Sequence, residues 1–223
     1  NEAIIEDMYQ AIGELDALIA VASFRESLPY YSLPEFTETD NAEGASLEVE
    51  ELYHPLIADP VVNGIRMQRG VLITGSNASG KSTFLKTIAI NTILAQTVHT
   101  CIAKRHRGSF LKVLTSMALR DNLAGGESYY MVEIRSLKRI LEECEKPEPV
   151  LCIVDEVLRG TNTIERIAAS SQIFHSLAKP KVLAMAATHD IELSYILEKE
   201  YDNYHFEEEI QEKDVVFDYK LRT

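Results

Sequence analysis

A glycine-rich stretch in the first half of the chain has the form G-x-x-x-x-G-K-[ST]; its residues are Gly75, Ser76, Asn77, Ala78, Ser79, Gly80, Lys81 and Ser82. Apolar and β-branched residues at 71–74 precede it, between two glycines, and predict a short buried strand. Residues 83–96 follow with apolar side chains at helical spacing and without glycine or proline, which predicts a helix. This order favours a phosphate-binding loop over a chance match in a turn, because a helix N-terminus offers unpaired N–H groups and partial positive charge to a polyanion.

The residue types within this stretch suit separate tasks. Gly75 and Gly80 allow the backbone to wrap around phosphate oxygens. Lys81 can reach the β- and γ-phosphates, and Ser82 can supply a hydroxyl ligand to magnesium. The expected cofactors are therefore ATP and Mg²⁺.

The residues just before the central strand bear on recognition of the base. Val61 and Val62 are the apolar residues close to that strand, so they are expected to pack against adenine. They provide packing area but no stacking face, which predicts only modest discrimination between ATP and GTP.

A pair of carboxylates, Asp155 and Glu156, ends the apolar run 150–154. Such a run is typical of a strand buried on both faces of a parallel sheet, and open α/β sheets bind ligands at the carboxyl ends of their strands. Asp155 can hold magnesium, directly or through water, and Glu156 can polarise the attacking water. An acidic helix cap is the alternative interpretation, but the phosphate loop upstream favours a catalytic pair.

A histidine follows the next apolar run, 182–187, in the order Thr188-His189-Asp190. At a strand end beside a phosphate loop, a histidine can sense the γ-phosphate or orient water, whereas a lone histidine elsewhere is more often structural. The position of His189 favours the functional interpretation.

The rest of the chain predicts an α/β fold with a boundary near residue 45. The polar stretch 27–45 is a candidate junction, and residues 59–64 are expected to form a turn. Apolar spacing and helix breakers predict further elements: helices over 2–27, 129–144 and 164–177, an edge strand over 46–56, a strand over 109–119 and a terminal hairpin over 203–221.

Composition narrows the classes of function. A net charge of −13 argues against an extended nucleic-acid face, and the one basic cluster, 104–107, is expected to be a solvated loop, with contact to DNA or a partner as the alternative. No apolar run approaches the length of a membrane span. The three cysteines have no C-x-x-C spacing and fit a reduced, cytoplasmic setting with buried thiols; they are Cys101, Cys144 and Cys152.

Taken together, these motifs resemble the ATPase domain of the MutS family of DNA mismatch-repair proteins, a branch of the ABC-type ATPases. Residues 74–85 resemble that family's phosphate loop and the start of its helix, in which an Asn at the position of Asn77 contacts nucleotide. Thr83 belongs to the same matching run. The chain departs from the usual pattern at Ser76, where the family commonly has Pro, and at Ser79, where it commonly has Gly.

The resemblance continues downstream. Residues 121–131 are similar to the ABC signature region, whose Ser, here Ser128, reaches the γ-phosphate bound by the opposite subunit. Asp155 and Glu156, with residues 159–161, resemble the Walker B and D-loop segment. Thr188 and His189 resemble the family's His switch.

The resemblance implies an architecture and partners. It implies a P-loop NTPase of ABC type with a mostly parallel central sheet over residues 46–223, entered at 1–45 by the last helix of a lever domain and a linker. It also implies a homodimer, contact with DNA through domains outside this chain, and other repair proteins as partners. The sequence contains no mismatch-reading domain, and MutS-related proteins without one exist.

Three functions are compatible with these residues. The first is an ATPase that drives a dimeric clamp on DNA, and the second is a nucleotide-gated switch of a MutS-related protein not involved in mismatch recognition. The third is a small-molecule kinase, which Glu156 beside Asp155 and the glycines at 125–126 disfavour, because they fit water as the acceptor.

Overall fold

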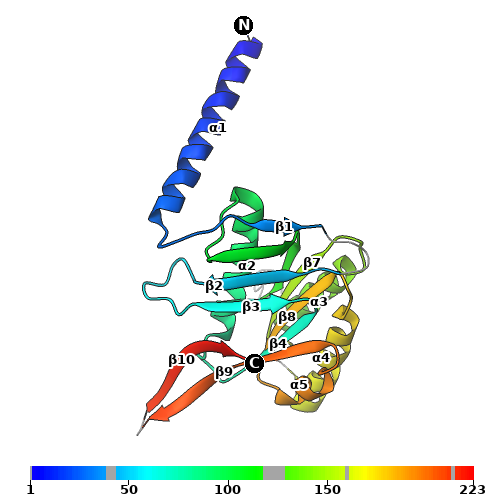
Figure 1. Ribbon diagram of the computed structural model, residues 1–223. Helices are drawn as coiled ribbons and strands as arrows, with labels where there is room; N and C mark the ends of the chain where they lie inside the picture. The colour runs from blue at the N-terminus through cyan, green and yellow to red at the C-terminus, as the bar shows by residue number, and fades with distance from the viewer. Residues whose placement is uncertain (1, 39–43, 118–128, 159–160, 212–213) are drawn as a thin grey trace.

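The computed structural model of the chain describes residues 2–38, 44–117, 129–158, 161–211 and 214–223. Helices and strands alternate along the chain and build two sheets with helices packed against them (Figure 1), so the predicted α/β class is confirmed. The helices are α1 (Glu2–Ser27), α2 (Lys81–Val98), α3 (Tyr129–Glu143), α4 (Thr163–Leu177) and α5 (Ile191–Ile196).

The larger sheet has the strand order β10-β9-β4-β8-β7-β6. Its neighbours pair in parallel except for the antiparallel hairpin β9–β10. The bounds are β4 (Gly70–Thr74), β6 (Lys112–Ser116), β7 (Val150–Asp155), β8 (Val182–Thr188), β9 (Tyr201–Gln211) and β10 (Asp214–Arg222).

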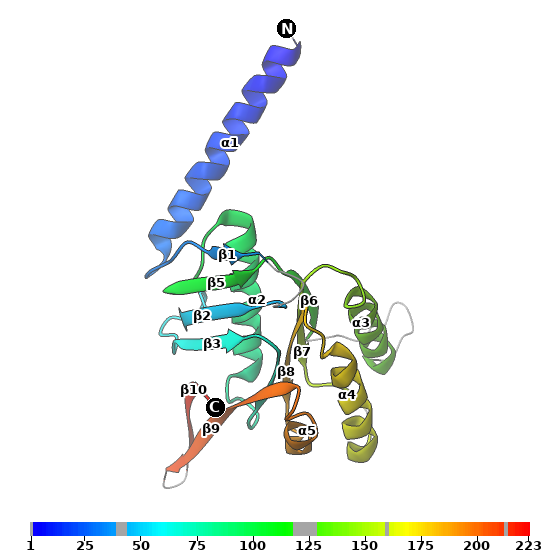
Figure 2. The same cartoon turned by 45° about the vertical axis from the view of Figure 1, so that its right-hand side comes forward.

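The smaller sheet has the order β1-β5-β2-β3, with bounds β1 (Glu35–Thr37), β2 (Leu47–Leu52), β3 (Asn63–Met67) and β5 (Arg105–Ser109). Helix α2 lies between the two sheets, and α3, α4 and α5 cover the opposite face of the larger one (Figure 2). The alternation of side chains in β4 follows this layering. Val71 and Ile73 face α2, whereas Leu72 faces the other helices, so the strand is apolar throughout.

The register of the larger sheet aligns the strand ends that carry the predicted motifs. Thr74, the last residue of β4, pairs with Thr188, the last residue of β8. Asp155, the last residue of β7, pairs with Ala187. The loops that follow these three strands therefore leave from one edge of the sheet, where α/β proteins bind ligands.

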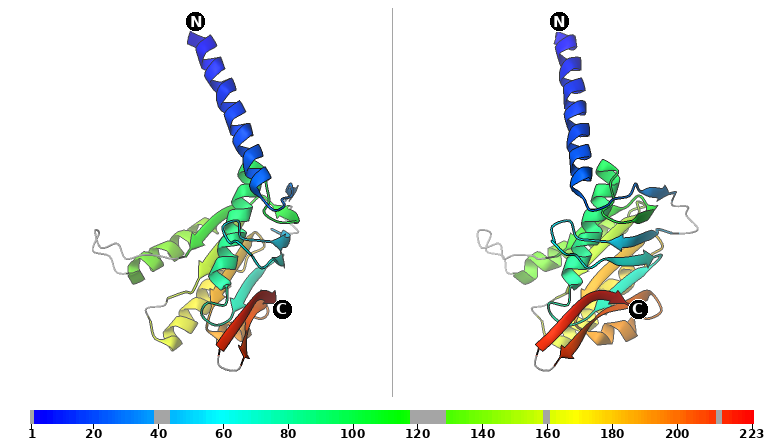
Figure 3. Two further views of the ribbon diagram at one scale, coloured as in Figure 1. Left: turned by 90° about the vertical axis from the view of Figure 1, so that its left-hand side faces the viewer. Right: turned by 60° about the vertical axis from the view of Figure 1, so that its left-hand side comes forward.

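Helix α1 extends away from this body (Figures 1 and 3). Its apolar residues are 55–76% exposed: Ile4, Ile5, Met8, Tyr9, Ile12, Leu15, Leu18 and Ile19. Near its end, Arg25 donates from Nε to Thr100 Oγ1 over 2.9 Å and from Nη2 to His99 O over 3.0 Å. Because His99 is the C-cap of α2, this arginine meets the carbonyl end of the helix dipole and joins α1 to α2.

The strand predicted over 46–56 is confirmed as β2, but its expected position at an edge is wrong, because β2 lies inside its sheet. β2 pairs with β3 on one side and with β5 on the other. The prediction of a turn over 59–64 missed that Asn63 begins β3. Only Ile65 and Met67 are buried in β3, which is too few apolar residues to reveal a strand by alternation.

The prediction of a solvated loop over 104–107 is also wrong. Residues from Arg105 onward form β5, in which His106 is buried and Arg107 points outward. The expected strand over 109–119 is in fact the end of β5 and the separate strand β6. The alternation of buried and exposed residues in β5 was not evident from the sequence. Two of its residues are arginines, and the buried residue between them is a histidine rather than an apolar side chain.

The remaining predicted elements are confirmed within a few residues: the long N-terminal helix, the helices α3 and α4, the strands β4, β7 and β8, and the terminal hairpin. All three cysteines are buried. The boundary between 1–45 and 46–223 stays a prediction; β1 pairs across it with β5. Within the described ranges, no helix is both long enough and apolar enough to cross a membrane.

Candidate functional site

The glycine-rich stretch forms a loop between β4 and α2, in the predicted order of strand, loop and helix. Gly75 and Gly80 have φ values of 147° and 104°, and Ala78 has a φ of 64°. A Cβ atom on Gly75 would lie 3.0 Å from Phe206 O, so the loop is both conformationally demanding and closely packed.

Lys81 folds back into this loop. Its side chain is 95% buried, and Nζ donates to Gly75 O over 2.7 Å and to Ser76 O over 2.6 Å. Gly80 caps α2 without a side-chain hydrogen bond, so the backbone N–H groups of the first turn face the loop without a side-chain competitor among the described residues. An ammonium group and these N–H groups together form a cradle for an anion.

A pocket of about 600 Å³ adjoins the loop, a size typical of small-molecule sites. Its lining includes predicted residues: Asn77, Ala78, Ser79, Gly80, Lys81, Ser82, Thr83 and Glu156. Further lining residues come from the segment between β2 and β3 and from the hairpin: His54, Ile57, Asp59, Pro60, Val61, Asn63, Phe206 and Tyr219. The pocket thus has a cationic, amide-rich end at the loop and a more apolar end.

Glu156 and His189 meet at the edge of this pocket. His189 Nε2 lies 2.7 Å from Glu156 Oε1, with the two side chains 35% and 19% exposed. Glu156 has a φ of 56°, which is costly for a residue with a side chain, and its N–H donates to Ala187 O over 3.0 Å. The fold therefore holds this carboxylate in a fixed and strained place beside the histidine.

Asp155 ends β7 next to Glu156. Its Oδ1 atom is buried and accepts no hydrogen bond from any described residue. A buried carboxylate oxygen of this kind is costly unless a cation or donor meets it. This carboxylate oxygen and the hydroxyl of Ser82 at the start of α2 are both hard oxygen ligands, the type that Mg²⁺ prefers, although only Ser82 lines the pocket.

The structure separates other predicted site residues from the pocket wall. Gly75 and Ser76 contribute their carbonyls to Lys81, as described above, and His189 reaches the pocket through Glu156. Val62 contributes its carbonyl to the hairpin, where it accepts from Lys220 Nζ over 3.0 Å. Ser128 lies outside the described residues.

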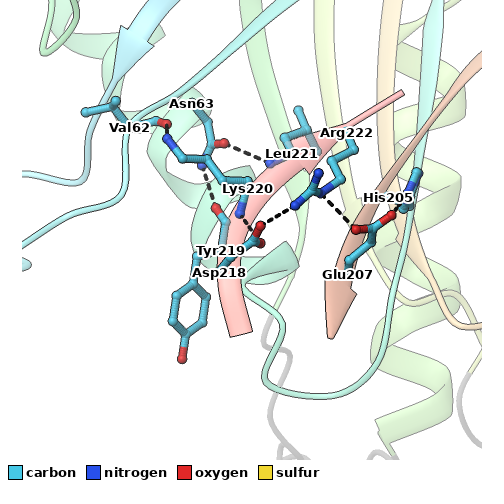
Figure 4. Close-up of polar contacts among 9 residues, drawn as sticks. All are labelled: Val62, Asn63, His205, Glu207, Asp218, Tyr219, Lys220, Leu221 and Arg222. Atoms are coloured by element: carbon cyan, nitrogen blue, oxygen red, sulfur yellow. Dashed lines mark hydrogen bonds and ion pairs between the residues drawn. The ribbon is translucent and has the colours of Figure 1, made fainter. Parts of the chain in front are cut away.

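Tyr219 is a lining residue that the sequence did not predict. A Cβ atom on Gly80 would lie 3.2 Å from Tyr219 Cδ1, so the ring stands directly over the loop. Asn63 holds the backbone there: Nδ2 donates to Tyr219 O over 2.9 Å, and Oδ1 accepts from Leu221 N over 2.8 Å (Figure 4). These contacts join residues more than 150 positions apart, so no local pattern could have revealed them.

The more apolar end of the pocket also contains His54. Burial, and secondarily the positive charge of Lys86, lower the pKa of His54 below its ordinary value. A neutral imidazole, the ring of Tyr219 and the side chain of Val61 therefore line this end, which suits a planar, uncharged ring.

Comparison with known proteins places the chain in a family. The model of the family described as MutS domain V matches residues 71–223. The chain is 32% identical to the DNA mismatch repair protein MutS of Persephonella marina over 96% of its own length and 25% of the relative's. It is also 32% identical to the DNA mismatch repair protein MutS of Thermus aquaticus, over 85% of its length and 23% of the relative's.

The chain thus spans about a quarter of the length of the curated relatives that it matches. The family match begins inside β4 and covers the glycine-rich loop, β7, β8 and the hairpin, whereas the lining residues between Leu52 and Asn63 lie outside it. On the strength of this match and these relatives, the chain belongs to the MutS family.

Proposed function

We propose that this chain is the ATP-binding and ATP-hydrolysing domain of a MutS-family DNA mismatch-repair protein, with the P-loop architecture of the ABC-type ATPases. The observation that carries the proposal is the convergence on one pocket of the buried Lys81, held inside the glycine-rich loop, and the Glu156–His189 pair. The loop binds the triphosphate, and the pair acts on the water that attacks it. The site is thereby equipped for both binding and hydrolysis.

Each residue has a distinct part in this reaction. Lys81 and the first-turn N–H groups of α2 bind the β- and γ-phosphates and offset their growing negative charge. Asp155 and Ser82 would hold Mg²⁺, which when bound neutralises phosphate charge. Glu156 orients and polarises water, and His189, which lies against the Glu156 carboxylate, fixes that carboxylate and would sense the γ-phosphate.

The base occupies the apolar end of the pocket. Tyr219 offers it a stacking face, with Val61 and His54 on the same lining. The side-chain amide of Asn63 donates to the Tyr219 carbonyl and accepts from the Leu221 N–H. The Val62 carbonyl accepts from Lys220. His54 and Asp59 remain as polar side chains on this lining, but stacking on the Tyr219 ring does not distinguish adenine from guanine, which favours modest discrimination between ATP and GTP.

The relatives are named DNA mismatch repair proteins, and we propose that the whole protein acts in mismatch repair as a dimeric clamp on DNA. In this proposal Ser128 completes the site of the opposite subunit, and DNA contacts domains outside this chain. The second candidate is a nucleotide-gated switch of a MutS-related protein. DNA-dependent turnover of the full-length protein supports the clamp, whereas turnover indifferent to matched and mismatched DNA supports the switch.

Two substitutions test the proposed ATPase. Lys81→Ala should weaken ATP binding about 10- to 100-fold, because the phosphates lose a charged donor in a buried site. Glu156→Gln should retain ATP affinity but slow hydrolysis about 10²- to 10⁴-fold, because the general base is lost. Nucleotide titration followed by a single-turnover assay measures both effects.

The matched controls are Lys199→Ala and Glu198→Gln, which change exposed residues next to the opposite end of β4 and should leave both quantities unchanged. Equal loss of ATP affinity in the Lys81 and Glu156 variants would refute the assignment of Glu156 as the base. Absence of ATP binding by the unsubstituted chain would refute the proposed function itself.

A further inference from the structure

A second ion pair lies beside the site, between α4 and the turn after β8. Arg166 donates from Nε to Asp190 Oδ2 over 2.7 Å and from Nη2 to Asp190 Oδ1 over 2.6 Å. The two side chains are only 23% and 11% exposed. A two-bond arginine–carboxylate pair fixes the relative orientation of two planar groups, and shielding from water keeps salt from weakening it.

Asp190 follows His189 directly, so the pair acts on the turn that carries the histidine. The N–H of Asp190 donates to Thr188 Oγ1 over 3.0 Å, which closes the turn on the side of β8. Asp190 is also the N-cap of α5 but makes no side-chain capping bond. An aspartate at that position usually accepts from the helix N–H groups, whereas here both carboxylate oxygens bind Arg166.

Arg166 is itself anchored to the segment that follows Glu156. Its N–H donates to Asn162 O over 2.9 Å, and Asn162 Oδ1 caps α4 by accepting from Glu165 N over 3.0 Å. The hydrogen bond to Asp190 raises the pKa of the Arg166 guanidinium, and the negative charge of Glu156 raises it further. The guanidinium is therefore within electrostatic reach of the Glu156 carboxylate and is bonded to the residue that follows His189.

From this geometry we infer that Arg166 is a positioning residue for the proposed ATP hydrolysis: through Asp190, it holds His189 in place against Glu156. Arg166 is absent from the pocket lining, so it acts without touching the nucleotide. The inference rests on the proposed function and adds to it a residue outside the shared motifs. Arg166 is therefore expected to affect the turnover rate, whereas nucleotide affinity depends on Lys81 and the loop.

The test separates turnover from affinity. Arg166→Ala should lower kcat about 10- to 100-fold, because a displaced histidine misplaces the Glu156 carboxylate, while KM changes by less than about threefold. Arg166→Lys should recover only part of the rate, because an ammonium cannot form the two-bond fork. Arg166→Ala and Asp190→Ala should also be non-additive: the double variant should be no slower than the slower single one.

Arg69→Ala is the matched control. Arg69 makes a comparable pair with Asp202, but at the start of β4, at the opposite end of the sheet from the site, so its loss should leave kcat unchanged. Thermal unfolding of each variant shows which variants fold. If Arg166→Ala does not fold, the kinetic comparison uses Arg166→Lys.

The outcomes distinguish this inference from the proposed function. If the unsubstituted chain hydrolyses ATP and a folded Arg166 variant turns over at the same rate, the positioning role is overturned and the ATPase stands. Parallel loss of affinity and rate in folded variants also overturns it, because that pattern indicates a general structural role. If the unsubstituted chain does not hydrolyse ATP, the proposed function fails first.

Discussion

His106 and Lys81 are both buried, but their side-chain nitrogens meet different hydrogen-bond partners. Two loop carbonyls accept hydrogen bonds from the ammonium group of Lys81, which offsets part of the cost of burying it. His106 is 1% exposed, and burial lowers its pKa to about 4. Asn91 Oδ1 accepts from Ile102 N, so its Nδ2 atom faces His106 Nδ1, 2.9 Å away, and donates to it. The imidazole is therefore neutral and serves as an acceptor.

This neutral histidine makes stability depend on pH. In the unfolded chain His106 binds a proton near pH 6.5, whereas in the folded chain it does so only near pH 4. Between these values the unfolded state binds more protons, so acid favours unfolding. The free energy of unfolding should fall as the pH drops from 6.5 to 4, by on the order of 3 kcal/mol from this residue.

Urea unfolding at several pH values measures this dependence. His106→Gln should be flatter over that window, because glutamine retains an acceptor for Asn91 but does not titrate. Equal slopes for the two proteins between pH 6.5 and 4 would contradict the prediction.

At the scale of elements, the hairpin β9–β10 completes the pocket from the far end of the chain. β9 pairs in parallel with β4, which delivers the hairpin beside the glycine-rich loop. An irregularity between Phe217 and Leu221 gives Tyr219 a φ of 54° and turns its ring toward Gly80. The two hydrogen bonds of Asn63 stabilise this bulge.

The hairpin leads to a prediction about base binding. Tyr219→Ala should weaken ATP and GTP binding by similar factors, because stacking on an aromatic ring is worth about 1–3 kcal/mol for any base. Tyr219→Phe should retain affinity, and Tyr195→Ala, on the exposed face of α5, should be neutral. Fluorescent-nucleotide titration measures each effect. A preference for ATP over GTP above about a hundredfold, roughly 2.7 kcal/mol, would instead indicate a hydrogen bond to the base edge.

At the scale of the whole molecule, the site collects residues from the loops after β4, β7 and β8, all at one edge of the larger sheet. Ser128 precedes α3 by one residue, and α3 packs beside β6 at the end of that sheet. β6 is separated from β4 by two strands. Ser128 itself lies outside the described residues, so its action on a nucleotide held by another chain stays a prediction from the family resemblance.

A mixing experiment tests that prediction. Ser128→Ala should leave ATP binding by one chain nearly unchanged but lower turnover, whereas Lys81→Ala loses binding. A mixed dimer of the two variants retains one intact composite site, so turnover should rise above that of either variant alone. No rise, in a sample shown by light scattering to contain mixed dimers, would count against action between chains.

Features were predictable from the sequence where the residues that form them lie close together in the chain. The loop 75–82 was identifiable because its glycines, lysine and serine are contiguous and lie between two regular elements. The positions of Asp155, Glu156 and His189 at strand ends were predictable because unbroken apolar runs predict buried parallel strands, whereas their catalytic roles stay predictions. The strands β3 and β5 were missed because their buried positions are few or occupied by a histidine.

The sequence by itself determined the α/β class, the strand–loop–helix unit and the residue types that suit phosphate and magnesium, because these depend on spacing within a few turns of chain. Only the tertiary structure decided which distant residues meet there. Tyr219 reaches the loop through strand pairing and the contacts of Asn63, and Arg166 reaches the histidine turn through the packing of α4 against α5. Contacts between segments far apart depend on register and packing, which the local pattern of residues does not encode.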